Sequence, residues 1–158
     1  MKFQLDALDT RTLSERGVDM QVRNIGTNEP LSVTPPALGD AEEKPVPVSI
    51  RLLGPDSDKY LQLQRAVSAA RMQRAQDASR ASGALDPAQE MRVIDEEEID
   101  TLSAVTVAWT GVFDAEWKAI PCNAENAAAL YRAYPVIRDQ AYRFMQMRSN
   151  FLLRPAGG

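Results

Sequence analysis

Residues 46–67 read VPVSIRLLGPDSDKYLQLQRAV, and the predicted fold rests on the change from strand to helix within them. Apolar residues alternate with other residues over 46–53, which is the pattern of a half-buried strand. Gly54 and Pro55 then form a turn, and Asp56, Ser57 and Asp58 are suited to capping a helix and to placing negative charge on its first turn. Apolar side chains at helical spacing follow, at Tyr60, Leu63, Val67 and Ala70. The stretch therefore predicts a strand, a turn and the start of a long helix.

The part of the chain before this stretch is rich in proline and in strand-forming residues. Residues 13–17 are typical of the end of a short helix, with Gly17 able to take the left-handed conformation that closes one. An alternating run at 18–25, the turn-forming residues GTNEP and a second apolar run at 31–33 predict a β-hairpin. Residues 34–45 contain three prolines and are expected to form a loop before the next strand.

The part after the Gly54 turn is expected to be helical. The first helix ends at the break SGALDP (82–87), and a second is expected at about 88–109. The segment TGVFDAEWKAIPC then forms a loop or a tight hairpin. Asn123 is suited to cap a third helix, which Pro135 must end, and a last helix is expected at about 136–151.

Together these elements predict an α+β fold. A small N-terminal antiparallel sheet, made of a hairpin and a third strand, is followed by a helical C-terminal region of three to four helices. We expect residues 1–54 to form the β-rich part and residues 55–158 the helical region, within one continuous domain.

Charge and composition exclude several classes of function. The 158 residues include 22 acidic and 18 basic side chains, and the net charge of −4 argues against non-specific binding to nucleic acid. The absence of histidine and the presence of a single cysteine exclude His-dependent catalytic triads, His-ligated zinc and thiolate metal clusters. Neither a GxxxxGKS/T nor a GxGxxG phosphate-binding motif is present. Chemistry that uses only carboxylates or lysine stays open, but no spacing singles out a pair. We expect a protein that is not an enzyme and that needs no metal or cofactor.

The hydropathy pattern bears on location. The chain contains no run of about 18 apolar residues, the length that a membrane-spanning helix needs. Its first residues, MKFQLDALD, lack the apolar run of a signal peptide, and Cys122 has no second cysteine with which to form an intramolecular disulfide. We expect a cytoplasmic protein that does not bind membranes, with Cys122 in a structural role.

Acidic and basic residues are segregated along the chain. Residues 59–80 and 131–154 each hold five basic and one acidic side chain, whereas residues 90–100 hold six acidic and one basic. Such stretches either neutralise one another within the fold or stay solvated, and the alternative is a docking surface for a charged partner. We interpret the run IDEEEID (94–100) as a solvated face near a helix N-terminus, because consecutive acids on a helix point in different directions and make a poor cation site.

Large aromatic and flexible side chains gather near the C-terminus. At helical spacing such residues usually form a core, and a helix rich in methionine and aromatic residues is also typical of an adaptable protein-binding surface. The second interpretation gives a hypothesis that a protein partner binds here. The residues in this hypothesis are Trp109, Tyr131, Tyr134, Arg138, Tyr142, Phe144, Met147 and Phe151.

From Ile50 onward the order of features resembles a family of phage proteins. The matching pieces are RLLGPDSDKY (51–60), a long arginine-rich helix, and an acidic segment that leads into TLSAVTVAWTGV (101–112). They continue in IPCNAENAAALYRAYPVIRDQAYRFMQMRSNFL (120–152), with Pro121, Asn126, Leu130, Tyr131, Pro135, Ile137, Gln140, Phe144 and Phe151. Over about two thirds of its length the chain thus resembles the tail assembly chaperones of long-tailed bacteriophages and prophages.

The resemblance implies a protein that binds the long, helical tape measure protein, or another tail protein, in the host cytoplasm. It would keep the tape measure protein soluble until tail tube subunits polymerise around it. Such a partner exposes much apolar helix surface, so its chaperone needs an adaptable apolar groove with a charged rim. The C-terminal segment is where we expect that groove.

Two other hypotheses remain open. One is a structural virion protein, such as a head-tail connector or a minor tail protein, and stable self-assembly into rings would favour it. The other is a small regulatory or host-inhibitory phage protein, and binding to a host enzyme would favour that. Whether the chain forms a homo-oligomer is open in each case.

Overall fold

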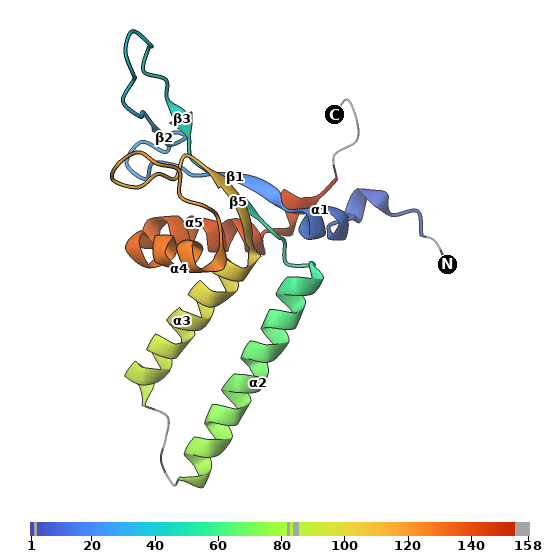
Figure 1. Ribbon diagram of the computed structural model, residues 1–158. Helices are drawn as coiled ribbons and strands as arrows, with labels where there is room; N and C mark the ends of the chain where they lie inside the picture. The colour runs from blue at the N-terminus through green and yellow to red at the C-terminus, as the bar shows by residue number, and fades with distance from the viewer. Residues whose placement is uncertain (2, 82, 84–85, 154–158) are drawn as a thin grey trace.

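The structure is a computed structural model that describes residues 1, 3–81, 83 and 86–153 (Figure 1). A small sheet packs against helices to form the body of the molecule, and a long helical hairpin extends away from this body. The helices are α1 (Arg11–Arg16), α2 (Asp58–Arg80), α3 (Pro87–Val105), α4 (Ala124–Ala133) and α5 (Pro135–Gln146), with short 3₁₀ helices at Asp6–Leu8 and Arg148–Phe151. The strands are β1 (Val18–Gln21), β2 (Ser32–Val33), β3 (Val46–Pro47), β4 (Ser49–Leu52) and β5 (Thr106–Thr110).

The main sheet has three antiparallel strands in the order β1-β4-β5. Ile50 in the central strand lies between Met20 of β1 and Trp109 of β5. The strands β2 and β3 form a separate antiparallel pair. The predicted α+β class, a small antiparallel sheet near the N-terminus with four helices from residue 58 onward, is confirmed.

The predicted hairpin differs from the observed one in its pairing. The chain does turn back after β1, because the Asn24 amide donates to the Glu29 carbonyl (2.9 Å) and Asn28 has a positive φ of 57°. Only an isolated bridge joins Arg23 to Pro30, however, and β1 pairs with β4 while β2 pairs with β3. Beyond this bridge Val48 bonds to both runs, because its carbonyl accepts the Val22 amide and its amide donates to the Leu31 carbonyl, both at 2.9 Å.

The prediction of a helix at 88–109 is wrong at its C-terminal end. Helix α3 stops at Val105, and the next five residues form β5, the third strand of the main sheet. The run from Val105 to Val107 is β-branched, which favours strand over helix, and the free edge of β4 supplies the hydrogen-bonding partner. The part of the chain after residue 54 therefore contributes a strand as well as helices.

The helix starts follow the predicted caps. The Ser57 hydroxyl accepts the Tyr60 amide and donates to the Gly54 carbonyl, and the Asn123 side chain accepts the Asn126 amide. The break at 82–87 is also present between α2 and α3, although Ser82, Ala84 and Leu85 lie outside the described residues.

The last helix ends earlier than predicted. Helix α5 stops at Gln146, and a 3₁₀ turn follows, stabilised by the Asn150 side-chain amide, which donates to the Phe144 carbonyl (3.0 Å). The turn brings Phe151 back against Phe144, with ring centroids 5.8 Å apart, and buries Phe151 completely. Burial of this aromatic ring explains why a straight helix to residue 151 is not adopted.

The core lies where the sheet meets α3, α4 and α5. Its largest fully buried side chains come from all of these elements and from the C-terminal 3₁₀ turn. They include Ile50, Leu52, Leu102, Tyr131, Met145 and Phe151. None of the helices in the described part of the chain has the length and apolar character that crossing a membrane requires.

Candidate functional site

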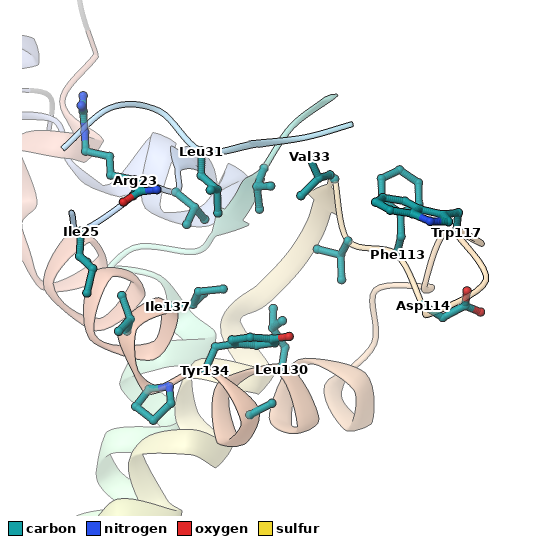
Figure 2. A pocket seen from close by; sticks show the side chains of 18 residues that line it. Arg23, Ile25, Leu31, Val33, Phe113, Asp114, Trp117, Leu130, Tyr134 and Ile137 are labelled. Carbon is teal, nitrogen blue, oxygen red and sulfur yellow. The ribbon is translucent and has the colours of Figure 1, made fainter. Parts of the chain in front are cut away.

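An apolar groove of about 590 Å³ opens on the side of the body where three distant segments meet (Figure 2). These are the turn after β1 with β2, the loop after β5, and the corner between α4 and α5. Ile25 lies on one side of the groove, Trp117 on the other, and Tyr134 along its floor. This volume is typical of a site that receives several apolar groups of a ligand or partner.

The turn that carries Ile25 is attached to α5 by one side chain. The Gln140 amide oxygen accepts the Arg23 backbone N–H (2.9 Å), and the Gln140 side-chain NH₂ donates to the Arg23 carbonyl (2.8 Å). Gln140 thus pairs with both backbone groups of Arg23, as a neighbouring strand would. This pairing fixes the position of the turn relative to the last helix.

The loop after β5 is a tight hairpin, one of its two predicted forms. The Asp114 carboxylate accepts the amides of Glu116 and Lys118, each at 2.9 Å, and Trp117 has a positive φ of 62°. The rings of Phe113 and Trp117 pack with centroids 5.9 Å apart. These contacts order the loop while the Trp117 side chain stays exposed to solvent.

The corner between α4 and α5 completes the groove. The Tyr134 amide closes α4 on the Leu130 carbonyl (2.9 Å), and Pro135 occupies the first turn of α5, where its missing N–H costs nothing. Leu130 and Ile137 are partly buried against the core below, while Tyr134 and Val136 face outward. The sharp change of direction at this proline therefore presents an aromatic and an aliphatic side chain to the groove.

The groove is bordered by apolar side chains that water reaches. Ile25 is 74% exposed and Tyr134 is 57% exposed, and Trp117 and Val136 are exposed as well. Figure 2 shows Arg23 at one end of the groove and Asp114 at the other. A contiguous apolar patch with charged groups at its margins is typical of a surface that binds a protein segment.

Most of the eight residues of the partner-binding hypothesis lie outside this groove. Tyr134 lines it. Tyr131 and Phe151 are fully buried, so their side chains pack in the core and are not presented to a partner. Trp109 is partly buried, and its indole N–H donates to the Ile120 carbonyl (2.7 Å); Phe144 is partly buried against Phe151. These four residues act in packing.

The other three residues of that hypothesis lie on α5 or just after it. Tyr142 and Met147 are exposed. The Arg138 guanidinium is half-buried, with its Nε 3.8 Å from a Glu98 carboxylate oxygen. The structure therefore brings Tyr134 together with groove residues and leaves Arg138, Tyr142 and Met147 on other parts of the helix surface.

Sequence reasoning missed Ile25, Trp117 and Val136. A signal was present for the first two. Ile25 falls out of step with the alternation of the residues before it, and Trp117 lies in a predicted loop or turn, so no period directs either side chain to the core. Val136 gave no such signal, since its place in the first turn of a helix is compatible with either burial or exposure.

Tyr131 belongs to the core because its hydroxyl has a hydrogen-bond partner there. The Thr106 hydroxyl donates to the Leu102 carbonyl (2.7 Å), so its single hydrogen is used and it accepts the Tyr131 hydroxyl (2.6 Å). Burial raises the pKa of Tyr131 to about 12. The tyrosine therefore joins α4 to the start of β5 as a neutral hydrogen-bond donor.

The segregated charges neutralise one another between helices, as one of the two interpretations predicted. Arg74 of α2 contacts Glu90 (2.7 Å) and Glu97 (3.0 Å) of α3, and Arg132 of α4 contacts Glu96 (2.9 Å). The hydrogen bond from Arg74 lowers the pKa of Glu90. The acidic run lies in the middle of α3 and not near its N-terminus, because that helix already begins at Pro87.

The structure also bears on metal binding. Among residues 1, 3–81, 83 and 86–153, no group of three or more Cys, Asp or Glu side chains is placed to hold a metal ion. Burial raises the pKa of the Glu98 carboxyl despite the nearby Arg138 and likewise raises the pKa of the Cys122 thiol.

Comparisons with protein families, with curated proteins and with solved structures find no match to this chain.

Proposed function

We propose that this chain is a non-catalytic tail assembly chaperone of a long-tailed phage or prophage. It binds apolar helical segments of the tape measure protein in the host cytoplasm and keeps them soluble during tail assembly. The observation that carries the proposal is the groove between the β1 turn, the loop after β5 and the α4–α5 corner, with four exposed apolar side chains around it. This is the kind of surface that the resemblance to that family implies.

The groove suits an amphipathic helix better than it suits a polar small molecule. Its lining is aliphatic and aromatic, and a helix inserts apolar side chains at positions i, i+3, i+4 and i+7 into such a surface. Arg23 and Asp114 at its two ends provide one charge of each sign with which to orient a bound segment. The aromatic side chains provide large contact areas for few rotatable bonds.

Co-expression tests the proposal directly. The tape measure protein of the same phage is produced with the wild-type chain, with a Tyr134→Asp/Trp117→Asp variant, or alone, and its soluble fraction is measured after centrifugation. We expect the wild type to keep the tape measure protein soluble and the groove variant to lose most of that effect, because a charge in the groove cannot be desolvated cheaply.

A matched control uses an exposed apolar residue elsewhere. Met72 on α2 is 65% exposed and lies away from the groove, so Met72→Asp should behave as the wild type does. A tape measure protein that stays insoluble beside the wild-type chain would contradict the chaperone proposal. Equal activity of the groove variant and the wild type would show that the groove is not its binding site.

One observation favours the structural virion protein as an alternative. The N-terminal segment exposes Phe3, Leu5 and Leu8, and virion subunits commonly need such surfaces to assemble. Mass spectrometry of purified particles and of the infected-cell lysate separates the two functions. A chaperone is abundant in the lysate and absent from particles, whereas stoichiometric presence in particles would identify a virion component.

A further inference from the structure

The first eight residues form an apolar arm without a surface of its own to cover. Phe3 is 71% exposed, Leu5 is 61% exposed and Leu8 is 69% exposed. The 3₁₀ turn at Asp6–Leu8 begins at Leu5, whose carbonyl accepts the Leu8 amide (2.8 Å). Apolar side chains gathered in this way on a chain terminus are unfavourable in water unless a partner covers them.

The arm ends at a fixed point. The Asp9 carboxylate accepts the amides of Arg11 and Thr12, both at 3.0 Å, and so caps α1. The Thr10 hydroxyl donates to Asp56 (2.6 Å). From Asp9 onward the chain is therefore attached to the body, and the arm (residues 1–8, described except for residue 2) extends from that attachment.

The arm and the groove lie on opposite sides of the molecule. In Figure 1 the N-terminus is at the right edge, whereas the groove elements β2, the loop after β5 and the α4–α5 corner are at the left. Two complementary apolar surfaces so placed on one chain meet between copies, in a head-to-tail contact, and not within one copy.

We propose that the N-terminal arm of one copy occupies the groove of a second copy, so that the chain self-associates head to tail. Phe3, Leu5 and Leu8 enter the groove beside Ile25 and Tyr134. The chemistry of both surfaces agrees with this occupant, because each is apolar and exposed.

The charges also agree. The arm has one basic and one acidic residue, Lys2 and Asp6, on either side of Phe3 and Leu5 in the sequence. The groove has Asp114 at one end and Arg23 at the other. For an arm laid along the groove, one direction sets unlike charges near each other at the two ends and the other sets like charges near each other, which favours the first direction.

Sedimentation velocity of the purified full-length chain over a wide concentration range tests the proposal. We expect the wild type to associate as its concentration rises. An arm variant (Phe3→Asp/Leu5→Asp) and a groove variant (Ile25→Asp/Tyr134→Asp) should each weaken association by about tenfold or more, as expected for central apolar contacts. The Met72→Asp control should associate as the wild type does.

Mixing the two variants is the decisive step. The arm variant retains an intact groove and the groove variant retains an intact arm, so a head-to-tail contact predicts a 1:1 complex of the two that grows no further. Circular dichroism checks that each variant is folded, and Tyr134→Ser replaces the groove variant if it is not. A wild type that stays monomeric, association that survives the arm changes, or a mixture of folded variants without a 1:1 complex would each overturn the proposal.

This inference concerns the chain alone, so its outcome is independent of the proposed tape measure partner. The form of the assembly then bears on function. Reversible chains that dissociate when the tape measure protein is added would favour the chaperone, because both ligands compete for one groove. A stable closed ring would favour the structural virion protein.

Discussion

The body of the molecule and the far half of the α2–α3 hairpin both pack helices side by side, but different interactions join them. In the body, Leu52, Leu102 and Phe151 are fully buried in a continuous apolar core. In the distal hairpin (residues 68–97), no described hydrophobic side chain is fully buried, and Arg74 contacts two glutamates instead. Apolar burial supplies most of the free energy of folding, whereas ion pairs that water still reaches contribute little and chiefly fix alignment.

The largest expected effect lies in the body. Replacement of Phe151 by alanine (Phe151→Ala) should lower the free energy of unfolding by about 3–5 kcal/mol, because it leaves a cavity beside Phe144 and Gly54. Urea denaturation measures this, and Met72→Ala in the distal hairpin should change it by less than about 0.5 kcal/mol. A loss below about 1 kcal/mol for Phe151→Ala would return this residue to the list of partner contacts.

Smaller losses of stability are expected from changes to the two partners of the buried hydrogen bond between Thr106 and Tyr131, and the two losses should differ. Thr106→Val should cost about 1–3 kcal/mol, because it leaves the Tyr131 hydroxyl buried without an acceptor. Tyr131→Phe removes the hydroxyl itself and should cost less, about 0.5–1.5 kcal/mol. Thermal or urea denaturation of both variants gives the order, and a larger loss for Tyr131→Phe would contradict the assigned donor and acceptor.

The distal hairpin should respond locally. Arg74→Gln removes the contacts with Glu90 and Glu97, and we expect several-fold faster hydrogen exchange in that part of α2 and α3. Amides near Leu102 should keep their protection, since that residue belongs to the apolar core. Arg92→Gln, an exposed arginine on the same hairpin, is the matched control. Equal loss of protection in the core would show that the hairpin and the body unfold as one unit.

The smallest expected effect is a dependence of the unfolding temperature on pH. The hydrogen bond from Arg74 holds the pKa of Glu90 below its ordinary value of 4.5. The stability that this ionised carboxyl contributes is therefore complete above pH 4.5 and is lost as the pH falls through the lowered pKa. The unfolding temperatures of the wild type and of Arg74→Gln should differ by at most about 2 °C at neutral pH and converge in acid.

Comparing the wild type with Arg74→Gln also removes the effect of Glu98, whose contribution to stability changes with pH in the opposite direction. Burial raises the pKa of Glu98, so the stability linked to its protonation is present below pH 4.5 and is lost as the pH rises through the raised pKa. Both proteins retain Glu98, and its effect cancels in the difference. A difference that grew in acid would contradict the assignment to Glu90.

Features of the fold that depend on local chemistry could be predicted from the sequence. The Ser57 and Asn123 caps and the new helix at Pro135 are set by neighbouring residues, and the structure has all three. Strand β5 was harder to predict, because the spacing of Ile99, Leu102 and Val105 continues a helical pattern while the β-branched run 105–107 favours a strand, and pairing with β4 decides between them.

The groove was still harder to predict than β5, because it depends on more distant parts of the chain. It forms where three segments meet that are far apart in the sequence, and no pattern within any one of them indicates the other two. The hypothesis of partner contacts included Tyr134, which lines the groove, and also Tyr131, three positions earlier, which faces the core. A single sequence does not show which face of a short helix is covered when the covering elements are unknown.

The place of β5 in the sheet has a consequence for the order of events during synthesis. The edge of β4 emerges from the ribosome early and stays unpaired until the whole α2–α3 hairpin has followed it. Helical hairpins form quickly from local contacts, and this one returns the chain to its starting point, so that β5 closes a short loop instead of a long one. Rapid formation of the charged hairpin thus shortens the time for which the open strand edge is exposed.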